Sequence, residues 1–411
     1  MIFTLPSLLI NRFQHWAFAL SLLLILISSC KKSENIQPVA IGNIAPPSLV
    51  DTSFNRLLDQ QILANIAKYN CPGVAVLVMH ENQVVFEKQY GTKSRYSTDS
   101  VDVSTLFRLG SLSKGFAGML SAILIDKHII ELEDPVSTYV PELTLKAKSS
   151  DKILRIKHIL THTSGLTEHA YSNLVDENYK METIISYLNK LSARDSTGKA
   201  YAYQNAAFGL IEKVIENATG MTYAEALDFY LFSPLQMCKT SCTFEDFSCA
   251  LNACTGHKFY GTKNGFVPIS VSPHYYNVAS AGGINAPISD MRIWLHAMMG
   301  YRPDVISPNA KNIAFTSYIS TAADDKSFNH WPGSKDSHYG LGWRLIRTEN
   351  NNLVYHGGLV NGFRAEIAFD RDKNIGIVVL SNSVCQYSNE AVHLFFDLWN
   401  NFYKPFDEEF I

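Results

Sequence analysis

The sequence predicts an α/β fold of the α+β kind, in which an antiparallel sheet is built from both chain ends around a mainly helical insertion. Residues 73–91, GVAVLVMHENQVVFEKQYG, have the pattern of two strands joined at 80–82. Helical periodicity dominates from about 125 to 300, and strand patterns return as hairpins over 341–356 and 363–382. Strands at both ends of a helical middle imply that the terminal strands share one sheet flanked by helices.

The folded domain is predicted to begin at residue 51. Apolar residues at helical spacing predict a first helix over 52–69, before the first hairpin. The later helical patterns cover residues 115–128, 181–191, 205–220 and 389–402. In the last hairpin, Phe363, Ala365 and Ile367 alternate onto one face. No internal repeat is visible, so we expect residues 51–411 to form one domain with a helical subdomain at about 125–300.

Composition indicates a globular protein with no nucleic-acid partner. The 411 residues are 46% hydrophobic and 18% charged, which is enough apolar material for a full core. The net charge is -3 and no dense Lys/Arg run occurs, whereas phosphate-binding proteins usually have a basic excess or stripe.

The N-terminus has the features of an export signal. The apolar stretch 16–27 is short for a membrane span and suits the central region of a signal peptide. It ends in ISSC, which resembles a lipobox, so residues 1–29 are predicted to be a lipoprotein signal peptide and Cys30 the lipidated residue. The alternatives are an ordinary signal cleaved at small residues or an uncleaved anchor.

A flexible tether is predicted to follow the anchor. Residues 30–50 carry several prolines and polar residues without an apolar period. The expected location is therefore the cell envelope, with the domain held to a membrane through Cys30 and facing the periplasm or the cell surface.

Six cysteines remain once Cys30 is assigned to the lipid, an even number that suits an oxidising compartment. Four of them crowd into Cys238 to Cys254. Their spacing lacks the CxxC pairs of a zinc site, so a local disulfide is favoured over free thiols and over a metal site. The pairing cannot be assigned from spacing.

The stretch RLGSLSKGF places Ser111 three residues before Lys114 at the start of a long apolar run. Residues three apart share a face of a helix, so the lysine can reach the serine hydroxyl, and a serine in the first turn lies near free backbone N–H groups. A serine becomes a nucleophile when a base takes its proton, and burial can lower a lysine pKa enough for that task. The same spacing occurs at 149–152 and 196–199, but in polar, loop-like surroundings.

Two further motifs follow in order. YQNAAFGLIEKV carries Tyr203 and Asn205 just before a helical period, and YHGGLVNGF carries His356, Gly357 and Gly358 at a strand. Together with SLSK they resemble the three motifs of the serine β-lactamase and penicillin-binding protein superfamily. The likeness is closest to its class C, DD-peptidase and family VIII esterase branches. Further landmarks of the family, in its order, are PGVAVLVMHENQVVFEKQYG, LEDPVSTYVPEL, ILTHTSGL, AGGINAPISDM and YGLGWRL.

The resemblance extends over about 57–399 and implies the β-lactamase/transpeptidase-like fold, with the active site in the cleft between the sheet and the helical part. Other YxN tripeptides occur at 171–173, 187–189 and 275–277. Only Tyr203 lies about forty residues after THTSGL and opens a helix, as the family pattern requires.

Carried over, the resemblance implies acyl transfer on Ser111 without metal or cofactor. Lys114 and Tyr203 would move the serine proton, with a positive lysine favouring tyrosinate. Asn205 would hold the acyl side chain or orient Lys114. The backbone N–H groups of Ser111 and Leu359 would form the oxyanion hole.

The third motif departs from the β-lactamase pattern. His356, Gly357 and Gly358 stand where those enzymes have Lys-Thr-Gly, whose lysine and threonine serve a substrate carboxylate. A largely neutral histidine and a glycine would remove a charge and a hydrogen bond, about 2 to 4 kcal/mol. Arg364 could restore the charge, or it could be a rim residue. The HxG form is common among the family's esterases and D-amino-acid peptidases.

Three functional hypotheses follow. The favoured one is a lipid-anchored serine hydrolase of the esterase or D-amino-acid peptidase type, acting on a small ester, amide or peptide. The second is a β-lactamase or a peptidoglycan DD-carboxypeptidase, and the third is a non-catalytic envelope binding protein. His158 and His162, around ILTHTSGL, are interpreted as hydrogen-bonded packing residues.

Overall fold

The computed structural model describes residues 52–145, 153–321 and 333–403. Its contacts divide the chain into two units, residues 1–44 and 45–411, and all described residues belong to the second. The predicted signal peptide, Cys30 and the tether lie outside the described residues and stay predictions.

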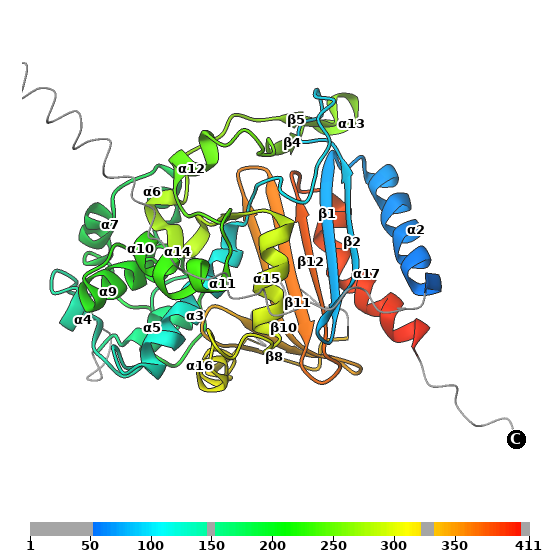
Figure 1. The fold of residues 1–411 in the computed structure, drawn as a ribbon. Coiled ribbons are helices and arrows are strands. Elements are labelled where there is room, and N and C mark those ends of the chain that lie inside the picture. The colour runs from blue at the N-terminus through cyan, green and yellow to red at the C-terminus, as the bar shows by residue number, and fades with distance from the viewer. Residues whose placement is uncertain (1–51, 146–152, 322–332, 404–411) are drawn as a thin grey trace, which may run out of the picture. The chain divides into compact units, whose positions relative to one another are not determined.

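Eight strands form one sheet in the order β2-β1-β12-β11-β10-β9-β8-β7. Their bounds are β1 Gly73–His80, β2 Gln83–Gly91, β7 Ile319–Ser320, β8 Asp336–Tyr339, β9 Arg344–Arg347, β10 Asn352–Val360, β11 Phe363–Asp370 and β12 Ile375–Ser381. Every neighbouring pair is antiparallel. The first strand pairs with the last, from Val74 opposite Ser381 to His80 opposite Ile375, which confirms the predicted sheet built from both chain ends (Figure 1).

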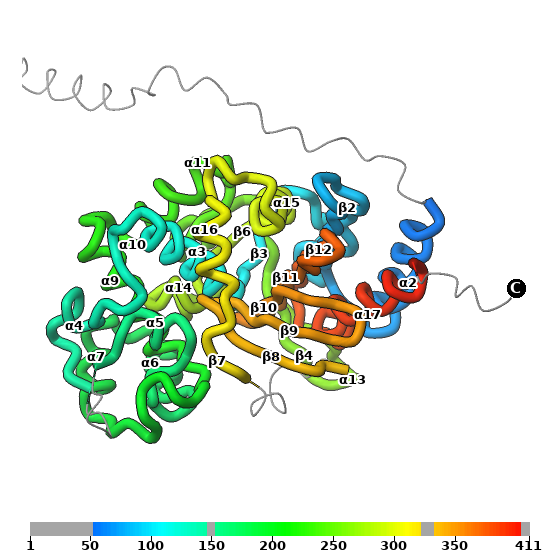
Figure 2. The backbone as a smooth tube through the Cα atoms, turned by 90° about the horizontal axis from the view of Figure 1, so that it is seen from below, coloured from blue at the N-terminus to red at the C-terminus, as the bar shows by residue number. Residues whose placement is uncertain are grey.

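Helices cover both faces of this sheet. On one face α2 (Thr52–Tyr69) and α17 (Gln386–Phe402) pack together, and on the other α15 (Ile288–Met298) lies against β1 and β12 (Figure 1). The central strands β1, β11 and β12 are buried along almost their whole length, because both of their faces are covered. In Figure 2, β12, β11, β10, β9 and β8 follow one another side by side.

The layer between the sheet and α2 with α17 is the main apolar core. From α2 it takes Phe54, Leu58 and Ile62, spaced four apart on one face of the helix, and from α17 it takes Phe395 and Trp399. The ring of Phe54 meets that of Trp399 edge to face, with centroids 5.2 Å apart. This packing fixes the two ends of the domain to each other.

A disulfide between Cys71 and Cys385 closes the same layer, 314 residues apart in sequence. The expected local disulfide among Cys238, Cys242, Cys249 and Cys254 is wrong, since all four are free. Sequence spacing failed here because the partners are remote along the chain, and pairing β1 with β12 brings them together.

The inserted helical part, as predicted, separates the first strands from the last. Its helices are α3 Ser113–Asp126, α4 Val136–Tyr139, α5 Ile156–Leu160, α6 Ser172–Asp176, α7 Met181–Leu188, α8 Asn205–Phe208, α9 Leu210–Thr219, α10 Tyr223–Leu227, α11 Ser233–Leu235, α12 Phe244–Ser248, α13 Gly261–Asn264, α14 Ala279–Gly282 and α16 Pro308–Ala314. The short strand β3 Phe107–Arg108 precedes these helices, and β4 His257–Phe259, β5 Phe266–Pro268 and β6 Asn285–Ala286 lie among them. The helix predicted over 205–220 is broken between α8 and α9 at Gly209, where a Cβ would lie 2.3 Å from Val278.

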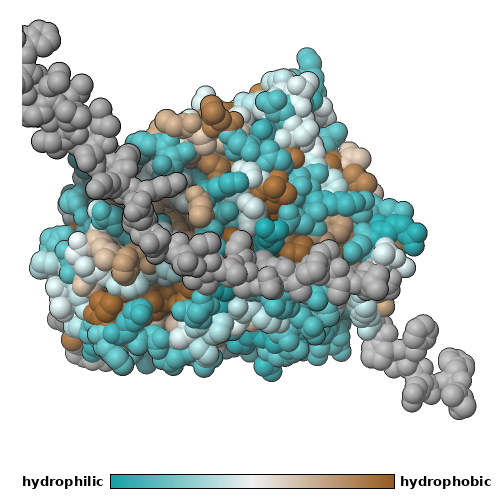
Figure 3. Space-filling model, in the orientation of Figure 1, coloured by the Kyte–Doolittle hydropathy of each residue, from teal (hydrophilic) through white to brown (hydrophobic). Residues whose placement is uncertain are grey.

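The surface shown in Figure 3 is largely hydrophilic, with hydrophobic residues in small separate groups. Among the described helices, none combines the length and apolar character needed to cross a membrane.

Candidate active site

Ser111 lies in the short connection between strand β3 and the buried helix α3. It belongs to a single 3-10 turn, Gly110–Leu112, which leads into α3. Gly110 has a φ of +54°, and a Cβ there would lie 2.7 Å from the backbone nitrogen of Leu359. Only glycine permits this conformation without strain and this close approach, so Gly110 lets the serine turn pack directly against β10.

Lys114 enters the protein interior because α3 is buried on every side. All residues from Ser113 to Ile125 are buried, and Lys114 itself is fully enclosed. The helix start therefore turns the lysine toward Ser111, one turn away, and keeps its amine out of water.

Three oxygens surround the Lys114 amine. Its Nζ lies 2.8 Å from Asn205 Oδ1, 2.8 Å from the carbonyl oxygen of Ala281 and 3.2 Å from Ser111 Oγ. None of these groups is an acid. Burial lowers the pKa of Lys114 well below its usual range, and the nearby positive charge of Arg344 lowers it further.

The phenol of Tyr203 approaches the serine from another side. Its hydroxyl lies 2.9 Å from Ser111 Oγ, and Lys114 Nζ lies 4.7 Å from the centre of its ring. Burial raises the pKa of Tyr203 to about 12, although the hydrogen bond with Ser111 and the charge of Arg344 act in the opposite direction. The phenol is therefore protonated at neutral pH.

Asn205, at the start of α8, links the lysine to Tyr275 through two hydrogen bonds. Its Oδ1 accepts from Lys114, and its Nδ2 donates to the hydroxyl of Tyr275 at 3.1 Å. Of the two roles expected for Asn205, orienting Lys114 is the one that would require the contact with its amine. The structure brings Ser111, Lys114, Tyr203 and Asn205 into one cluster, as the motifs predicted.

Gly357 and Gly358 belong to β10, which lies against the serine turn. A Cβ on Gly358 would lie 1.9 Å from the carbonyl oxygen of Leu109 and 2.9 Å from the backbone nitrogen of Ser111. The absence of a side chain at Gly358 therefore brings the N–H groups of Ser111 and Leu359 onto closely facing segments, as an oxyanion hole requires. The side chain of Leu359 is half exposed.

His356 is buried and both of its ring nitrogens are engaged. Nδ1 lies 2.8 Å from the carbonyl oxygen of Gly357, which can only accept, so Nδ1 carries the proton. Nε2 then accepts from the hydroxyl of Tyr339 at 3.0 Å. Burial, Arg344 and Lys114 lower the pKa of His356 well below its usual range, so the ring is neutral and offers no further donor.

Arg364 lies on the opposite face of β10 and β11 from Ser111. A Cβ on Gly357 would contact the guanidinium nitrogens of Arg364, whereas a Cβ on Gly358 would contact the backbone of Ser111. Successive residues of a strand point to opposite faces of the sheet, so Arg364 and Ser111 lie on opposite faces. The side chain is buried in an ion pair with Glu366, which also accepts a hydrogen bond from Tyr355. The structure thus contradicts the expectation that Arg364 supplies charge to a substrate in the cleft.

The positive charge near the site comes instead from Arg344 in β9, a residue that sequence reasoning missed. It is buried, and its guanidinium carbon lies 6.0 Å from the ring centre of Tyr201 and 5.8 Å from that of Tyr339. No salt bridge to Arg344 occurs within the described parts of the chain. An arginine among the apolar residues of YGLGWRL was the available signal.

His162 is the packing residue expected from the sequence. Its ring is buried against that of Tyr203, with centroids 4.3 Å apart, and its Nδ1 accepts from the backbone N–H of Gln204. The histidine therefore supports Tyr203 from behind. Across the described residues, no group of three or more His, Cys, Asp or Glu side chains is placed to hold a metal ion.

The fold and the site define the serine β-lactamase/transpeptidase-like class. The model of the Beta-lactamase family matches residues 57–392, so the chain belongs to this family. A solved octameric penicillin-binding protein homologue from Pyrococcus abyssi shares the fold, with a TM-score of 0.73 and 22% identity over 85% of this chain and 78% of that one.

Two curated relatives are similarly distant. "Protein flp" of Staphylococcus aureus strain MW2 is 22% identical over 82% of this chain, which spans only 64% of that protein's length. "Unguisins hydrolase ungD'" of Aspergillus campestris is 22% identical over 88% of this chain and 69% of its own length. The family consists generally of serine hydrolases, and one of these relatives is named as a hydrolase.

Proposed function

We propose that the protein is a serine hydrolase that forms an acyl-enzyme on Ser111 and hydrolyses an ester or an amide. The observation that carries this proposal is the pair of contacts on Ser111 Oγ, 3.2 Å from a buried lysine and 2.9 Å from a protonated tyrosine. A binding protein needs neither group beside its serine.

The contacts of Lys114 favour the amine itself as the base. A neutral amine has two N–H bonds and one lone pair. The two shorter contacts, to Asn205 and the carbonyl of Ala281, take the N–H bonds, which leaves the lone pair for the hydroxyl proton of Ser111. This assignment replaces the tyrosinate expected from the resemblance, because Tyr203 holds its proton.

Acylation then proceeds in two steps, in which the proton taken from Ser111 replaces the one given to the leaving group. Ser111 Oγ attacks the carbonyl carbon while its proton moves to Lys114, and the N–H groups of Ser111 and Leu359 receive the oxyanion. The bond to the leaving group breaks as that group takes the proton of Tyr203, which Lys114 restores. In deacylation a water molecule adds to the acyl carbon, its proton passes to the same base, and Ser111 leaves with a proton.

The third motif supports substrates without an anionic group at that end of the cleft. His356 is neutral, and its donor is already bound to Gly357. It therefore cannot replace the lysine that binds a carboxylate in β-lactamases. We accordingly favour an esterase or D-amino-acid peptidase type of activity over a β-lactamase or DD-carboxypeptidase.

We also propose export and lipid anchoring through Cys30, on the sequence features alone. Labelling with a radioactive fatty acid in the native host tests this, since the Cys30→Ala variant should lose the label.

The function is tested by comparing a short p-nitrophenyl ester, a chromogenic cephalosporin and a D-alanyl peptide as substrates. We expect the ester or the D-amino-acid peptide to be hydrolysed fastest, Ser111→Ala to be inactive, and Ser186→Ala, which changes an exposed serine on α7, to match the wild type. Fast turnover of the cephalosporin would overturn the argument from His356. If the wild type and Ser111→Ala were equally inactive on all three substrates, the enzyme proposal would fail and the hypothesis of a non-catalytic binding protein would remain.

A further inference from the structure

A polar cavity of about 500 Å³ opens beside α5, outside the Ser111 cluster. Its described lining residues are Ile153, Arg155, Lys157, His158, Thr161, Thr163, Thr197, Gly198, Lys199 and Tyr318. Three of these are cations and none is acidic. Nothing in the acyl-transfer chemistry uses this cavity.

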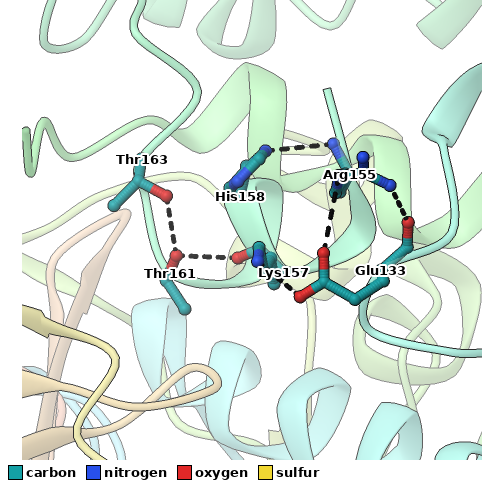
Figure 4. A network of polar contacts seen from close by, with 6 residues as sticks. All are labelled: Glu133, Arg155, Lys157, His158, Thr161 and Thr163. Atoms are coloured by element: carbon teal, nitrogen blue, oxygen red, sulfur yellow. Dashed lines mark hydrogen bonds and ion pairs between the residues drawn. The ribbon is translucent and has the colours of Figure 1, made fainter. Parts of the chain in front are cut away.

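Part of the positive charge at the cavity is neutralised. Arg155 and Lys157 both form ion pairs with the carboxylate of Glu133, which lies outside the lining, and Figure 4 shows the two basic side chains converging on it. The side chain of Lys199 is exposed and forms no hydrogen bond or ion pair within the described ranges, whereas its backbone N–H donates to the carbonyl of Ser196. Among the described side chains that line the cavity, and with the carboxylate that pairs with two of them, three cations and one anion leave an excess of two positive charges.

The cavity wall also offers a neutral donor. His158 Nδ1 accepts from the backbone N–H of Arg155 at 3.1 Å, and burial lowers the pKa of His158 to about 4, so its proton is on Nε2. A Cβ on Gly198 would lie 3.1 Å from that Nε2, which places the N–H beside Gly198. No acceptor for Nε2 occurs in the part of the chain that the structure describes.

Hydroxyl groups line the same wall. Thr161 donates to the carbonyl of Lys157 at 2.7 Å, and the hydroxyls of Thr161 and Thr163 lie 2.9 Å apart (Figure 4). These contacts hold the two threonines side by side, so the wall is fixed before any ligand arrives.

The cavity shares its walls with the segments that position Tyr203. Thr161 and Thr163 line the cavity, whereas His162 between them adopts a φ of +57° and packs on Tyr203. The backbone N–H of Gly198 donates to the carbonyl of Thr163 at 2.8 Å, linking the two segments. A molecule in the cavity therefore contacts the chain directly behind the tyrosine of the Ser111 site.

We propose that this cavity binds a phosphate-type oxyanion carried on a larger molecule. The guanidinium of Arg155, the amines of Lys157 and Lys199, and the N–H of His158 offer more donors than the two oxygens of a carboxylate can use. A tetrahedral phosphoryl group presents three or four oxygens and up to two negative charges, which match the donors and the excess charge. The volume exceeds that of a phosphoryl group alone, so part of the attached molecule fits inside.

The proposal is tested by isothermal titration of the full chain with inorganic phosphate, with glycerol 3-phosphate and with acetate, at constant ionic strength. We expect both phosphates to bind at millimolar concentration or tighter and acetate to bind at least about fivefold more weakly. Tighter binding of glycerol 3-phosphate than of inorganic phosphate would support a phosphoryl group on a larger molecule, whereas the reverse order would contradict the larger molecule and favour free phosphate. Equal binding of acetate, or no heat from either phosphate, would overturn the proposal.

Variants assign the binding to the cavity. Lys199→Gln changes an exposed side chain and should fold normally, yet weaken phosphate binding about fivefold. Lys263→Gln, which removes an exposed cation from α13, is the matched control and should bind as the wild type does. Arg155→Gln provides a second position on the wall. Unchanged phosphate binding in both Lys199→Gln and Arg155→Gln would place the anion elsewhere and contradict the proposal.

Discussion

The two faces of the β10–β11 hairpin bury strong bases in opposite ways. On the face toward α17, Arg364 is paired with the carboxylate of Glu366, and Tyr355 donates to the same acid. On the face toward the helical part, Lys114 is equally enclosed, but the described groups around its amine are uncharged: an amide, a carbonyl, a hydroxyl and the rings of two aromatic residues. A buried cation with a counterion keeps its charge, whereas a buried amine without one loses its proton.

The difference separates a structural pair from a reactive one. Replacing one member of the Arg364–Glu366 pair should affect folding, because an unpaired charge would remain in the interior. Replacing Lys114 should affect chemistry, because no counterion is left behind. The following predictions test that separation, from the largest expected effect to the smallest.

Lys114→Met should lower the rate of acylation by about 10² to 10⁴-fold, the usual contribution of a positioned base. Its thermal midpoint should stay near that of the wild type, since methionine fills similar space in an apolar helix. Stopped-flow measurement of ester hydrolysis, with circular dichroism as the folding control, checks both parts. A variant that unfolds would make Lys114 a structural residue.

Glu366→Gln should reduce the free energy of unfolding by about 3 to 5 kcal/mol, because it leaves the Arg364 guanidinium buried without its partner. Denaturant titration measures the loss. The double variant Arg364→Met/Glu366→Leu should recover much of it, and activity per folded molecule should be retained in both. A loss of turnover without a loss of stability would instead connect this pair to the cleft.

Removing the disulfide with Cys71→Ala/Cys385→Ala should cost about 2 to 5 kcal/mol, because the bond closes a loop of most of the domain. Thermal melting under oxidising conditions gives the size of the effect. Cys238→Ala, which removes an exposed free thiol, should be neutral. An equal loss from Cys238→Ala would show that the thiols pair differently in solution.

Glu212 gives a smaller, pH-dependent effect. Burial raises its pKa to about 7, so between the ordinary glutamate pKa of 4.5 and about 7 the folded state binds more protons than the unfolded state. The free energy of unfolding should therefore fall by roughly 1 to 3 kcal/mol as pH rises through this window. Unfolding curves across the range test this, and Glu212→Gln should remove the slope. A slope that persists in Glu212→Gln would assign it to another group.

The sheet and the residues around Ser111 could be predicted from the sequence, because both depend on local patterns that follow a fixed order along the chain. Strand alternation and the three motifs are such patterns, and they led to Ser111, Lys114, Tyr203 and Asn205. Sequence-based reasoning failed where the outcome depends on the other face of a strand or on a distant segment. Neither alternative for Arg364, a charge in the cleft or a rim residue, could be tested by spacing, since the face of β11 that carries its side chain depends on how β10 meets the serine turn.

The missed features have a common cause. Cys71 meets Cys385 only because the terminal strands pair. Arg344 reaches the tyrosines around the site only once β9 and β8 are side by side. Contacts between remote segments cannot be predicted from the spacing of residues along the chain. A charged residue within an apolar strand, such as Arg344, does indicate a buried charge.

The central claim, that neutral Lys114 activates Ser111, is tested most directly by the pH dependence of labelling with a fluorophosphonate. We predict that the wild type is labelled only at Ser111, at a rate that is constant around neutral pH and falls on acidification as Lys114 takes up a proton. Lys114→Met should lose this reaction together with its pH dependence. Labelling of Lys114→Met at the wild-type rate, or a wild-type rate that rises only as Tyr203 ionises near pH 12, would contradict the account.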